Sequence, residues 1–565
     1  MALTQHVVYL ERIAQPRDSG GVTSAATNGT SGPNAGRAPQ YVTSAGRAKE
    51  FFALILRILK NPVNPVHLKS MTLPEALYTG AQVRELDRRA IEAHGIPGSE
   101  LMERAGAAAF AALRTRFPRA RAIGVVCGPG NNGGDGYVLA RLAREAGLAV
   151  FVMRVGAART GGDAARARQK CEAAGVAVGD FALGLLVACD VVVDALFGTG
   201  LSREVEAEGR AAIEAMNVSG RPVLALDIPS GLQADSGRVL GAAVRAHATV
   251  TFIGLKAGLF TGEGRTHAGE ILFDSLGVPA EVYSALTPQA YRLTETGLRG
   301  LLPRRARTAH KGEAGFVLVV GGDRGMPGAA QLAGRGALRA GAGLAILATH
   351  PVHAAAVNAA CPELIAHGVR TEKDLRGLLA RATVIGLGPG LGQSGWGRTL
   401  FRAALKAARP LVVDADGLNW LATKPSRRDD WILTPHPGEA ARLLKMTAAG
   451  IQTDRFAAAR AIAKRYGGVC VLKGSGTLIA SADGEPIELC DRGNPGMASG
   501  GMGDVLTGVI AALRAQGLSP RDAACLGVWV HAAAGDDAAA QGGEIGLIAS
   551  DLLAFVRARL NRIAT

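Results

Sequence analysis

The stretch Gly493-Asn-Pro-Gly-Met-Ala-Ser-Gly-Gly-Met-Gly-Asp-Val-Leu-Thr-Gly508 indicates a glycine-rich loop that leads directly into a helix. Because Gly500, Gly501 and Gly503 lack Cβ atoms, the backbone can turn sharply and point several N–H groups at one bound anion. Apolar residues from Val505 onward recur at helical spacing, which places the loop at a helix N-terminus, where the helix dipole favours negative charge. The stretch therefore predicts a phosphate-binding loop of an α/β fold.

Asp504 lies in the first turn of that predicted helix. A carboxylate beside an anion site is unfavourable unless it has a task there. Accepting a proton from a substrate hydroxyl that lies next to a phosphate is such a task, and we predict it for Asp504. The alternative interpretation is an aspartate that only complements the helix dipole.

Length and composition limit the classes of protein to consider. A chain of 565 residues predicts at least two domains, each with its own core. The net charge of +15 would suit nucleic acid, but arginines are spread along the chain and aromatic residues make up only 4%, so we expect no nucleic-acid partner. The apolar run 51–59 is too short to cross a bilayer, so we expect no membrane contact. The seven cysteines lack metal-binding spacing, which favours reduced core residues in a cytoplasmic protein.

Residues 1–70 are rich in Ser, Thr, Gly, Ala and Pro and show no sustained hydrophobic periodicity. We expect a disordered extension without a functional site. It lacks the pattern of a secretory signal. Because patterned sequence begins at Met71, an over-extended start codon is one interpretation and a weak targeting peptide is the other.

From Thr72 the sequence alternates helix and strand patterns. Residues 81–94 and 99–115 predict helices, and residues 122–127 predict a buried strand. That strand is followed by Gly128-Pro-Gly-Asn-Asn-Gly-Gly-Asp-Gly136 and by a predicted helix from Tyr137, which is the phosphate-binding arrangement of open α/β sheets. Further strands are predicted at 149–154, 191–195, 223–228 and 248–254.

Polar residues follow three of these strands, namely Asp194, Asp227 and Lys256. Ligands of open α/β sheets bind beyond the carboxyl ends of the strands, so we expect these side chains to converge. Helix capping is the alternative for the two aspartates, and a tight turn is the alternative for Asn131–Gly136.

A connection at about 284–310 leads to a second unit that again alternates strands and helices. Two doubly wound sandwiches in series are therefore the simplest architecture. For Lys473–Thr477 ordinary hairpin chemistry remains an alternative, and His436 between two prolines can be a structural residue. Strands are predicted at 316–321, 344–349, 384–387, 411–414, 431–434 and 469–473, with polar or glycine residues at their ends at 321–323, 350, 386–392, 414–416, 434–438 and 473–477.

These motifs resemble those of a known family, the bifunctional nicotinamide-nucleotide repair enzymes. Asn131–Gly136, Asp194–Leu201 and Asp227–Gly231 resemble its N-terminal domain. Gly386–Gly392, Thr434–Glu439, Lys473–Thr477 and Asn494–Gly508 resemble its C-terminal domain. The resemblance covers roughly residues 71–560. It implies a Rossmann-like three-layer sandwich with NAD(P)H-hydrate epimerase activity at 71–290 and a ribokinase-like α/β domain with ADP-dependent NAD(P)H-hydrate dehydratase activity at 296–562.

The resemblance implies repair of hydrated NADH and NADPH. The first domain would interconvert the R and S hydrates, and the second would return the S hydrate to NAD(P)H with release of AMP and phosphate. A potassium ion is implied in the epimerase and a magnesium ion with ADP in the dehydratase, where no residue is assigned to it. The expected partners are small molecules only, NADH and NADPH hydrates and ADP, and we expect a homo-oligomer.

The resemblance also implies the residues of each site. For the epimerase, the implied substrate contacts are Asn131, Asn132, Gly133, Gly134, Asp135, Gly198, Thr199, Gly200, Leu201, Ser202, Arg203, Glu204 and Asp227, the potassium ligands are Asn132, Asp194 and Ser230, and we assign proton transfer to Asp194 and Lys256. For the dehydratase, the implied substrate contacts are Ala329, Gly390, His436 and Asp504, with Asp504 as the base, and the nucleotide contacts are Lys473, Gly474, Ser475, Gly476, Thr477 and Gly503.

Two other functions fit parts of the sequence. A glycine loop followed by an aspartate also suits a ribokinase-like kinase that phosphorylates a vitamin or sugar alcohol with ATP. The N-terminal half could alternatively be a nucleotide-sensing or protein-binding module. The presence of Asp194, Asp227, Ser230 and Lys256 argues against such a degenerate site.

Overall fold

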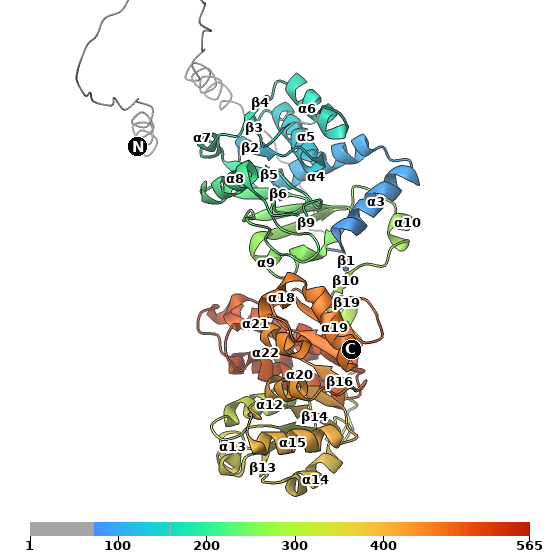
Figure 1. The fold of residues 1–565 in the computed structure, drawn as a ribbon, viewed down its shortest axis with the longest axis vertical. Coiled ribbons are helices and arrows are strands. Elements are labelled where there is room, and N and C mark those ends of the chain that lie inside the picture. Colours follow the sequence, from blue (N-terminus) through green and yellow to red (C-terminus); the bar gives the residue numbers. More distant parts are fainter. Residues whose placement is uncertain (1–72, 158–159, 565) are drawn as a thin grey trace, which may run out of the picture. The chain divides into compact units, whose positions relative to one another are not determined.

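The computed structural model describes residues 73–157 and 160–564 (Figure 1). The disordered extension predicted for residues 1–70 lies outside these ranges. In the described part of the chain, no helix combines the length and the apolar character needed to cross a bilayer.

The first sheet has seven strands, all parallel, in the order β4-β3-β2-β5-β6-β7-β9. The chain moves outward from β2 in one direction and from β5 in the other, so the topological switch point lies between β2 and β5. The strands are β2 (Ala122–Cys127), β3 (Ala149–Arg154), β4 (Ala177–Asp180), β5 (Val191–Ala195), β6 (Val223–Leu226), β7 (Ala248–Phe252) and β9 (Glu270–Asp274).

Helices cover both faces of this sheet. Val125 points into the core under helices α3 to α6, whereas its neighbour Val126 points into the core under α7 and α8. This alternation is the period of a β-strand with two buried faces, and it explains the continuous apolar runs. The helices are α3 (Gly80–Glu92), α4 (Gly98–Arg116), α5 (Asn131–Glu145), α6 (Asp163–Ala173), α7 (Leu183–Leu186), α8 (Ala207–Val218), α9 (Gly264–His267) and α10 (Ala280–Ser284), with the 3₁₀ turn η1 (Ala257–Leu259).

The second sheet has twelve strands in the order β13-β12-β11-β14-β15-β16-β17-β18-β19-β10-β1-β8. Strands β13 to β17 are parallel, and the switch point lies between β11 and β14. The strands are β1 (Ala76–Tyr78), β8 (Leu255–Lys256), β10 (Ala290–Arg292), β11 (Phe316–Val320), β12 (Leu344–Thr349), β13 (Ile365–Gly368), β14 (Val384–Leu387), β15 (Leu411–Val413), β16 (Trp431–Leu433), β17 (Val469–Leu472), β18 (Thr477–Ser481) and β19 (Ile487–Cys490).

The far edge of this sheet comes from earlier in the chain. Strands β1, β8 and β10 follow β19 in the sheet order, although they precede β11 in the sequence. The segment predicted as a plain connection at 284–310 therefore contains a strand, β10, that pairs with β19. Its three residues are too few for a recognisable alternation, so periodicity could not reveal it.

Helices also cover both faces of the second sheet, with α12 and α20 to α22 over one core and α14 to α19 over the other. Helices α12 and α20 lie side by side in close contact (Figure 1). A Cβ atom at Gly508 would lie 1.9 Å from the Ala333 carbonyl oxygen, so only glycine permits this approach. The helices are α11 (Glu295–Leu298), α12 (Pro327–Arg339), α13 (Ala354–Ala360), α14 (Glu372–Arg381), α15 (Gly395–Lys406), α16 (Ala415–Thr423), α17 (Pro437–Leu444), α18 (Ala448–Thr453), α19 (Arg455–Tyr466), α20 (Met502–Ala515), α21 (Pro520–Gly542) and α22 (Leu552–Ile563), with the 3₁₀ turns η2 (Pro351–His353), η3 (Pro495–Met497) and η4 (Ala549–Asp551).

One predicted boundary was wrong. Helix α5 begins at Asn131 rather than at Tyr137, so the Asn-Asn-Gly-Gly-Asp-Gly run forms its first turns instead of a loop. Glycine has low helix propensity, which is why the sequence favoured a loop. The glycines serve close packing, because a Cβ at Gly136 would lie 2.6 Å from the Ala195 Cβ and one at Gly133 would lie 2.0 Å from the Gly128 carbonyl oxygen.

Candidate active sites

The first candidate site lies at the switch point of the seven-stranded sheet. Asn132 is in the first turn of α5, and Asp194 is at the end of β5. Both are buried, and neither the amide oxygen nor the amide nitrogen of Asn132 has a hydrogen-bond partner among the described residues. The Asp194 carboxylate accepts hydrogen bonds from the Ser230 hydroxyl at 2.6 Å and the Ser230 backbone N–H at 2.8 Å. Burial raises the pKa of Asp194 to about 6.

Lys256 pairs with Asp227 rather than with Asp194. Its ammonium contacts the Asp227 carboxylate and donates to the Thr251 hydroxyl and the Phe252 carbonyl oxygen, both at 2.9 Å. The Lys256 side chain is fully buried, whereas that of Asp227 is 15% exposed. Asp227 also holds an unusual positive φ of 64°, which points to a conformation imposed by its surroundings. Asp227 and Lys256 therefore converge as expected, whereas none of the hydrogen bonds of Lys256 reaches Asp194. The assignment of proton transfer to Asp194 and Lys256 stays a prediction.

The charges of Asp227 and Lys256 act on two further carboxyl groups. Burial, and then the charge of Asp227, raises the pKa of Asp87 on α3 to about 6. Burial, followed by Asp227 and Asp87, raises the pKa of Asp135 well above its ordinary value, while Lys256 opposes the rise. Asp135 was among the predicted contacts, but Asp87 was missed because nothing in its local sequence separates it from other helix acids.

The loop after β5 adjoins these groups through its first residues. A Cβ at Gly198 would lie 3.4 Å from the Asn132 Cβ and 3.4 Å from the Asp227 Oδ2. The Thr199 carbonyl oxygen accepts a hydrogen bond from the Arg84 guanidinium at 3.2 Å. The predicted residues Ser202, Arg203 and Glu204 are exposed on the same loop. The structure therefore joins 131–135, 198 and 227, which the sequence had placed at three separate strand ends.

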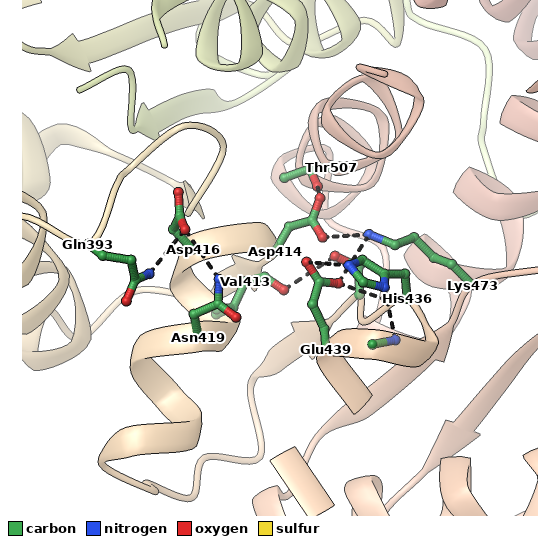
Figure 2. Close-up of polar contacts among 11 residues, drawn as sticks. Gln393, Val413, Asp414, Asp416, Asn419, His436, Glu439, Lys473 and Thr507 are labelled. Atoms are coloured by element: carbon green, nitrogen blue, oxygen red, sulfur yellow. Dashed lines mark hydrogen bonds and ion pairs between the residues drawn. The ribbon is translucent and has the colours of Figure 1, made fainter. Parts of the chain in front are cut away.

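The second candidate site is built around a buried ion pair (Figure 2). The Lys473 ammonium, at the end of β17, lies 2.6 Å from Asp414 Oδ1 and 3.8 Å from Glu439 Oε2. Asp414 follows β15, and its other oxygen accepts a hydrogen bond from the Thr507 hydroxyl of α20 at 2.8 Å. The nearby lysine holds the pKa of Asp414 below its ordinary value although burial opposes this.

Asp504 faces this network from the start of α20. Burial, and then the charge of Asp414, raises the pKa of Asp504 to about 7, with Lys473 opposing and Glu439 and Asp416 adding to the rise. A Cβ at Gly503 would lie 3.2 Å from the Lys473 ammonium and 3.4 Å from Asp414 Oδ2. Glycine at 503 therefore lets the N-terminus of α20 come close to the ion pair, as the phosphate-loop interpretation requires.

His436 caps α17. The ring Nδ1 of His436 accepts a hydrogen bond from the Gly438 N–H at 3.0 Å. The backbone N–H of His436 donates to the Glu439 carboxylate at 2.8 Å. Burial and the positive charges of Lys473 and Arg442 lower the pKa of the His436 imidazole, so the ring is neutral at pH 7. The structural alternative for His436 is thus observed, and the ring also lies beside the ion pair (Figure 2).

The other predicted dehydratase residues lie on two loops, 386–392 and 473–477, and on helix α12. A Cβ at Gly390 would lie 3.3 Å from the Ala329 Cβ, so these two predicted substrate contacts are neighbours. Gly392, on the same loop, donates its N–H to Asp416 at 2.8 Å. In the 473–477 loop, the buried Arg455 guanidinium donates to the Gly476 carbonyl oxygen at 3.2 Å.

Four polar residues of this network were not assigned from the sequence. Asp414 and Asp416 were recognised as strand-end carboxylates without a role, and their position in an Asp-Ala-Asp motif was the available signal. Glu439 and Thr507 became visible only through their contacts. Within the described ranges, no cluster of three or more His, Cys, Asp or Glu side chains is arranged to hold a metal ion.

Comparison with known proteins identifies the family. Residues 98–258 match the family model described as YjeF-related protein N-terminus, and residues 317–557 match the one described as NAD(P)H-hydrate dehydratase. A Coxiella burnetii protein named bifunctional NAD(P)H-hydrate repair enzyme is 50% identical over 486 residues, which cover 86% of this chain and 99% of that protein. The chain belongs to this family. An Escherichia coli (strain K12) repair enzyme of the same name is 42% identical over 89% of this chain and 96% of its own length.

The family membership confirms several predictions. The chain is a bifunctional NAD(P)H-hydrate repair enzyme with an epimerase family domain followed by a dehydratase family domain, in the predicted two-domain α/β fold. This family membership replaces the two alternative functions, a small-molecule kinase and a nucleotide-sensing or protein-binding module. Among solved structures, an ADP/ATP-dependent NAD(P)H-hydrate dehydratase from Bacillus subtilis, co-crystallised with ATP/Mg²⁺, is similar at 31% identity with a TM-score of 0.43 and covers 48% of this chain and 97% of that chain.

Proposed function

We propose that the first domain, residues 71–290, interconverts the R and S hydrates of NADH and NADPH. The second domain, residues 296–562, dehydrates the S hydrate with ADP and releases AMP and phosphate. The observation that supports the dehydratase most strongly is Asp504, an acid with a pKa of about 7 at the start of the glycine-lined α20 and beside the Lys473–Asp414 pair. A base poised near neutral pH is what proton removal from a substrate hydroxyl requires.

In the dehydratase, Asp504 takes the proton of the ring hydroxyl as that oxygen attacks the β-phosphorus of ADP. The bond from this phosphorus to the bridging oxygen breaks and AMP leaves. The backbone N–H groups at 500–503 and Lys473 stabilise the negative charge of the phosphoryl group. The ring nitrogen then expels the new phosphate ester as phosphate, and loss of a proton from the adjacent ring carbon restores the dihydropyridine of NAD(P)H.

Several residues support nucleotide binding in this proposal. The loop that follows β17 supplies Lys473, Gly474, Ser475, Gly476 and Thr477, and Gly503 faces the first of these residues. Arg455 fixes this loop through its hydrogen bond to the Gly476 carbonyl oxygen. A magnesium ion would be held largely by the phosphates, as is usual for this ion, with the carboxylates near Lys473 available as additional oxygen ligands. It would offset charge on the ADP phosphates.

In the epimerase, Asn132, Asp194 and Ser230 would hold a potassium ion. The test of fit is the donor set: a buried amide oxygen without a partner, a buried carboxylate and a hydroxyl are all hard oxygen ligands. A bound cation would supply positive charge that stabilises the Asp194 carboxylate.

Proton transfer in the epimerase would use the acids around Lys256. Asp135, whose pKa is raised well above its ordinary value by burial, can give a proton to the ring hydroxyl, which leaves as water. Water can then return to either face of the ring, with Asp194 accepting its proton. Lys256, which we predicted as the partner of Asp194, would act by holding Asp227 in place.

The test uses a mixture of R and S NADH hydrates with ADP and follows the recovery of NADH absorbance. The wild-type chain should recover both hydrates in one rapid phase, whereas Asp194→Asn should rapidly recover only the S portion. If Asp194→Asn recovers both hydrates as fast as wild type, the role of Asp194 in epimerisation is wrong. If the wild-type rate does not depend on ADP, the dehydratase proposal is wrong.

Two further expectations concern the state of the protein. We propose a cytoplasmic location, which is supported by seven cysteines that are all free and buried. We also propose a homo-oligomer, which is supported by the exposed side chains of Ile545 and Ile548 ahead of α22. Light scattering of the purified protein would test the second expectation, and a monomeric mass would contradict it.

A further inference from the structure

A polar pocket outside the assigned residues lies at the carboxyl edge of the second sheet. It has a volume of ≈ 520 Å³ and is lined by Arg324, His350, Pro351, Val352, Arg370 and Trp396. None of these residues belongs to the predicted substrate or nucleotide contacts. The lining combines two guanidinium groups with two aromatic rings.

The topology places this pocket on one side of the reaction centre. Arg324, His350 and Arg370 follow β11, β12 and β13, whereas Asp414 and Lys473 follow β15 and β17. In the sheet order, β12 is three strands from β15 and five strands from β17. At a spacing of about 4.8 Å per strand, the pocket lies roughly 14 Å from Asp414 and roughly 24 Å from the nucleotide loop. The pocket and the 473–477 loop therefore lie on opposite sides of Asp414 along the strand order.

The rings of the pocket are held in fixed positions. The Trp396 indole N–H donates to the Val369 carbonyl oxygen at 2.8 Å, and the ring centroids of Trp396 and His350 lie 5.7 Å apart at an angle of 61°. The His350 Nδ1 accepts from the Val352 N–H at 3.4 Å. Burial and the charge of Arg324 lower the pKa of His350, which leaves a neutral ring. Half-buried aromatic rings whose orientation is set by hydrogen bonds are suitable surfaces for stacking a base.

The two arginines are available for a phosphate. The Arg324 guanidinium contacts only the ring Nε2 of His350, at 3.4 Å, and in the described part of the chain neither Arg324 nor Arg370 forms an ion pair with a carboxylate. The carboxylate of Asp374 accepts hydrogen bonds from the backbone N–H groups of Arg370 and Thr371. An unpaired guanidinium is the group best suited to bind a phosphate through two hydrogen bonds.

A series of hydrogen bonds links the pocket to the reaction centre. The Asp323 N–H donates to the Gly390 carbonyl oxygen at 2.7 Å, and the Ser394 hydroxyl donates to Asp323 at 2.6 Å. The same loop reaches Asp416 through Gly392. Arg324 follows Asp323, and Trp396 follows Ser394, so both pocket residues are anchored to the loop that carries the predicted substrate contact Gly390.

We propose that this pocket binds the adenosine phosphate half of the hydrated dinucleotide, with the adenine against Trp396 and His350 and a phosphate on Arg324 and Arg370. The inference rests on the dehydratase proposed above, because a nicotinamide that reacts at Asp504 must extend its riboses, pyrophosphate and adenine along the sheet edge away from ADP. The phosphate is either the pyrophosphate, present in both hydrates, or the 2′-phosphate, present only in the NADPH hydrate.

The test is a steady-state comparison of Arg324→Ala and Arg370→Ala with wild type, using the full chain and purified S hydrates of NADH and NADPH. Loss of a charged hydrogen bond should raise the KM for the hydrate by about tenfold or more, while kcat and the KM for ADP stay within twofold. Arg398→Ala is the matched control, because Arg398 is an exposed arginine of the same helix as Trp396 and does not line the pocket.

The outcomes distinguish the pyrophosphate from the 2′-phosphate, and they distinguish a failure of the pocket inference from a failure of the proposed function. A rise in KM for both hydrates assigns the pyrophosphate, and a rise for the NADPH hydrate alone assigns the 2′-phosphate. Unchanged KM values for both hydrates, or an equal rise in the KM for ADP, would overturn the inference. A wild-type chain without ADP-dependent recovery would instead overturn the proposed function, which the same assay shows before any variant is compared.

Discussion

Each half of the molecule holds one lysine against an aspartate at the end of a parallel sheet, but the two pairs differ in their surroundings. Lys256 is fully buried and its partner Asp227 is 15% exposed, whereas Lys473 is 19% exposed and its partner Asp414 is 2% exposed. In the first pair the lysine is enclosed by oxygen atoms. In the second pair the lysine is accessible to solvent and the aspartate is buried, which we call a sealed aspartate.

This difference separates two uses of the same ion pair. An enclosed lysine cannot reach a phosphate, but it can fix a carboxylate against the substrate and adjust the acidity of its neighbours Asp87 and Asp135. A lysine anchored by a sealed aspartate keeps its charge and can present it to a nucleotide. Burial, together with the carboxyl groups around Lys473, raises the pKa of Asp504 into the range of a general base.

The largest expected effect tests whether the two sites are chemically independent. Asp504→Asn should lower the dehydratase kcat by about 1,000-fold, because the base is lost, and should leave epimerisation within twofold. Stopped assays of NADH recovery and of hydrate epimer ratio would measure both. Asp522→Asn is the control, since Asp522 is also an acid in the first turn of a helix, α21. Equal losses in the two variants would support the helix-dipole interpretation of Asp504.

The next effect compares the two lysines by stability. Lys473→Met should lower the free energy of unfolding by about 3 kcal/mol at pH 8, because it leaves the sealed Asp414 without a counter-charge. Lys256→Met should cost less, about 1–2 kcal/mol, because water can reach the partly exposed Asp227. Urea denaturation would measure both values. A larger loss in Lys256→Met would contradict the distinction between sealed and accessible aspartates.

The pH dependence of the two activities should also differ. The dehydratase kcat/KM should fall about tenfold per pH unit below pH 7, because protonation of Asp504 removes the base. The epimerase, which needs the Asp194 carboxylate, should hold its rate down to about pH 6 or lower, because the proposed potassium ion stabilises that carboxylate and opposes the rise in pKa caused by burial. Rates measured from pH 5 to pH 9 would show two separate inflections. A single shared inflection would indicate that one group controls both reactions.

The smallest expected effect concerns stability at the dehydratase site. The pKa of Asp504 lies at about 7 in the folded chain and at its ordinary value of 3.8 in the unfolded chain. Its ionisation therefore lowers the stability of the fold as the pH rises from about 4 to 7. Asp504→Asn should therefore stabilise the protein at pH 8 and have much less effect at pH 4, as measured by urea denaturation. An unchanged or lower stability at pH 8 would mean that the carboxylate is not strained.

The fold was largely predictable because its signals are local. Apolar runs such as 122–127 and 316–321 differ from the observed strands by a residue at most, since a strand buried on both faces has an uninterrupted apolar sequence. Helix α5 was predicted to start too late, because its first turns consist of glycine and asparagine that tertiary packing forces into a helix. Strand β10 was missed because three residues carry too little pattern.

The sequence by itself determined the order of elements, the glycine loops and the strand-end acids, since these depend on backbone freedom and hydrophobic periodicity within a few residues. Only the tertiary structure decided that Lys256 pairs with Asp227, that Asp87 joins that cluster, and that Asp504 is crowded by other acids. The physical reason is that ion pairing and pKa depend on burial and on charges a few ångströms away. In this chain those charges come from residues that are far apart in sequence.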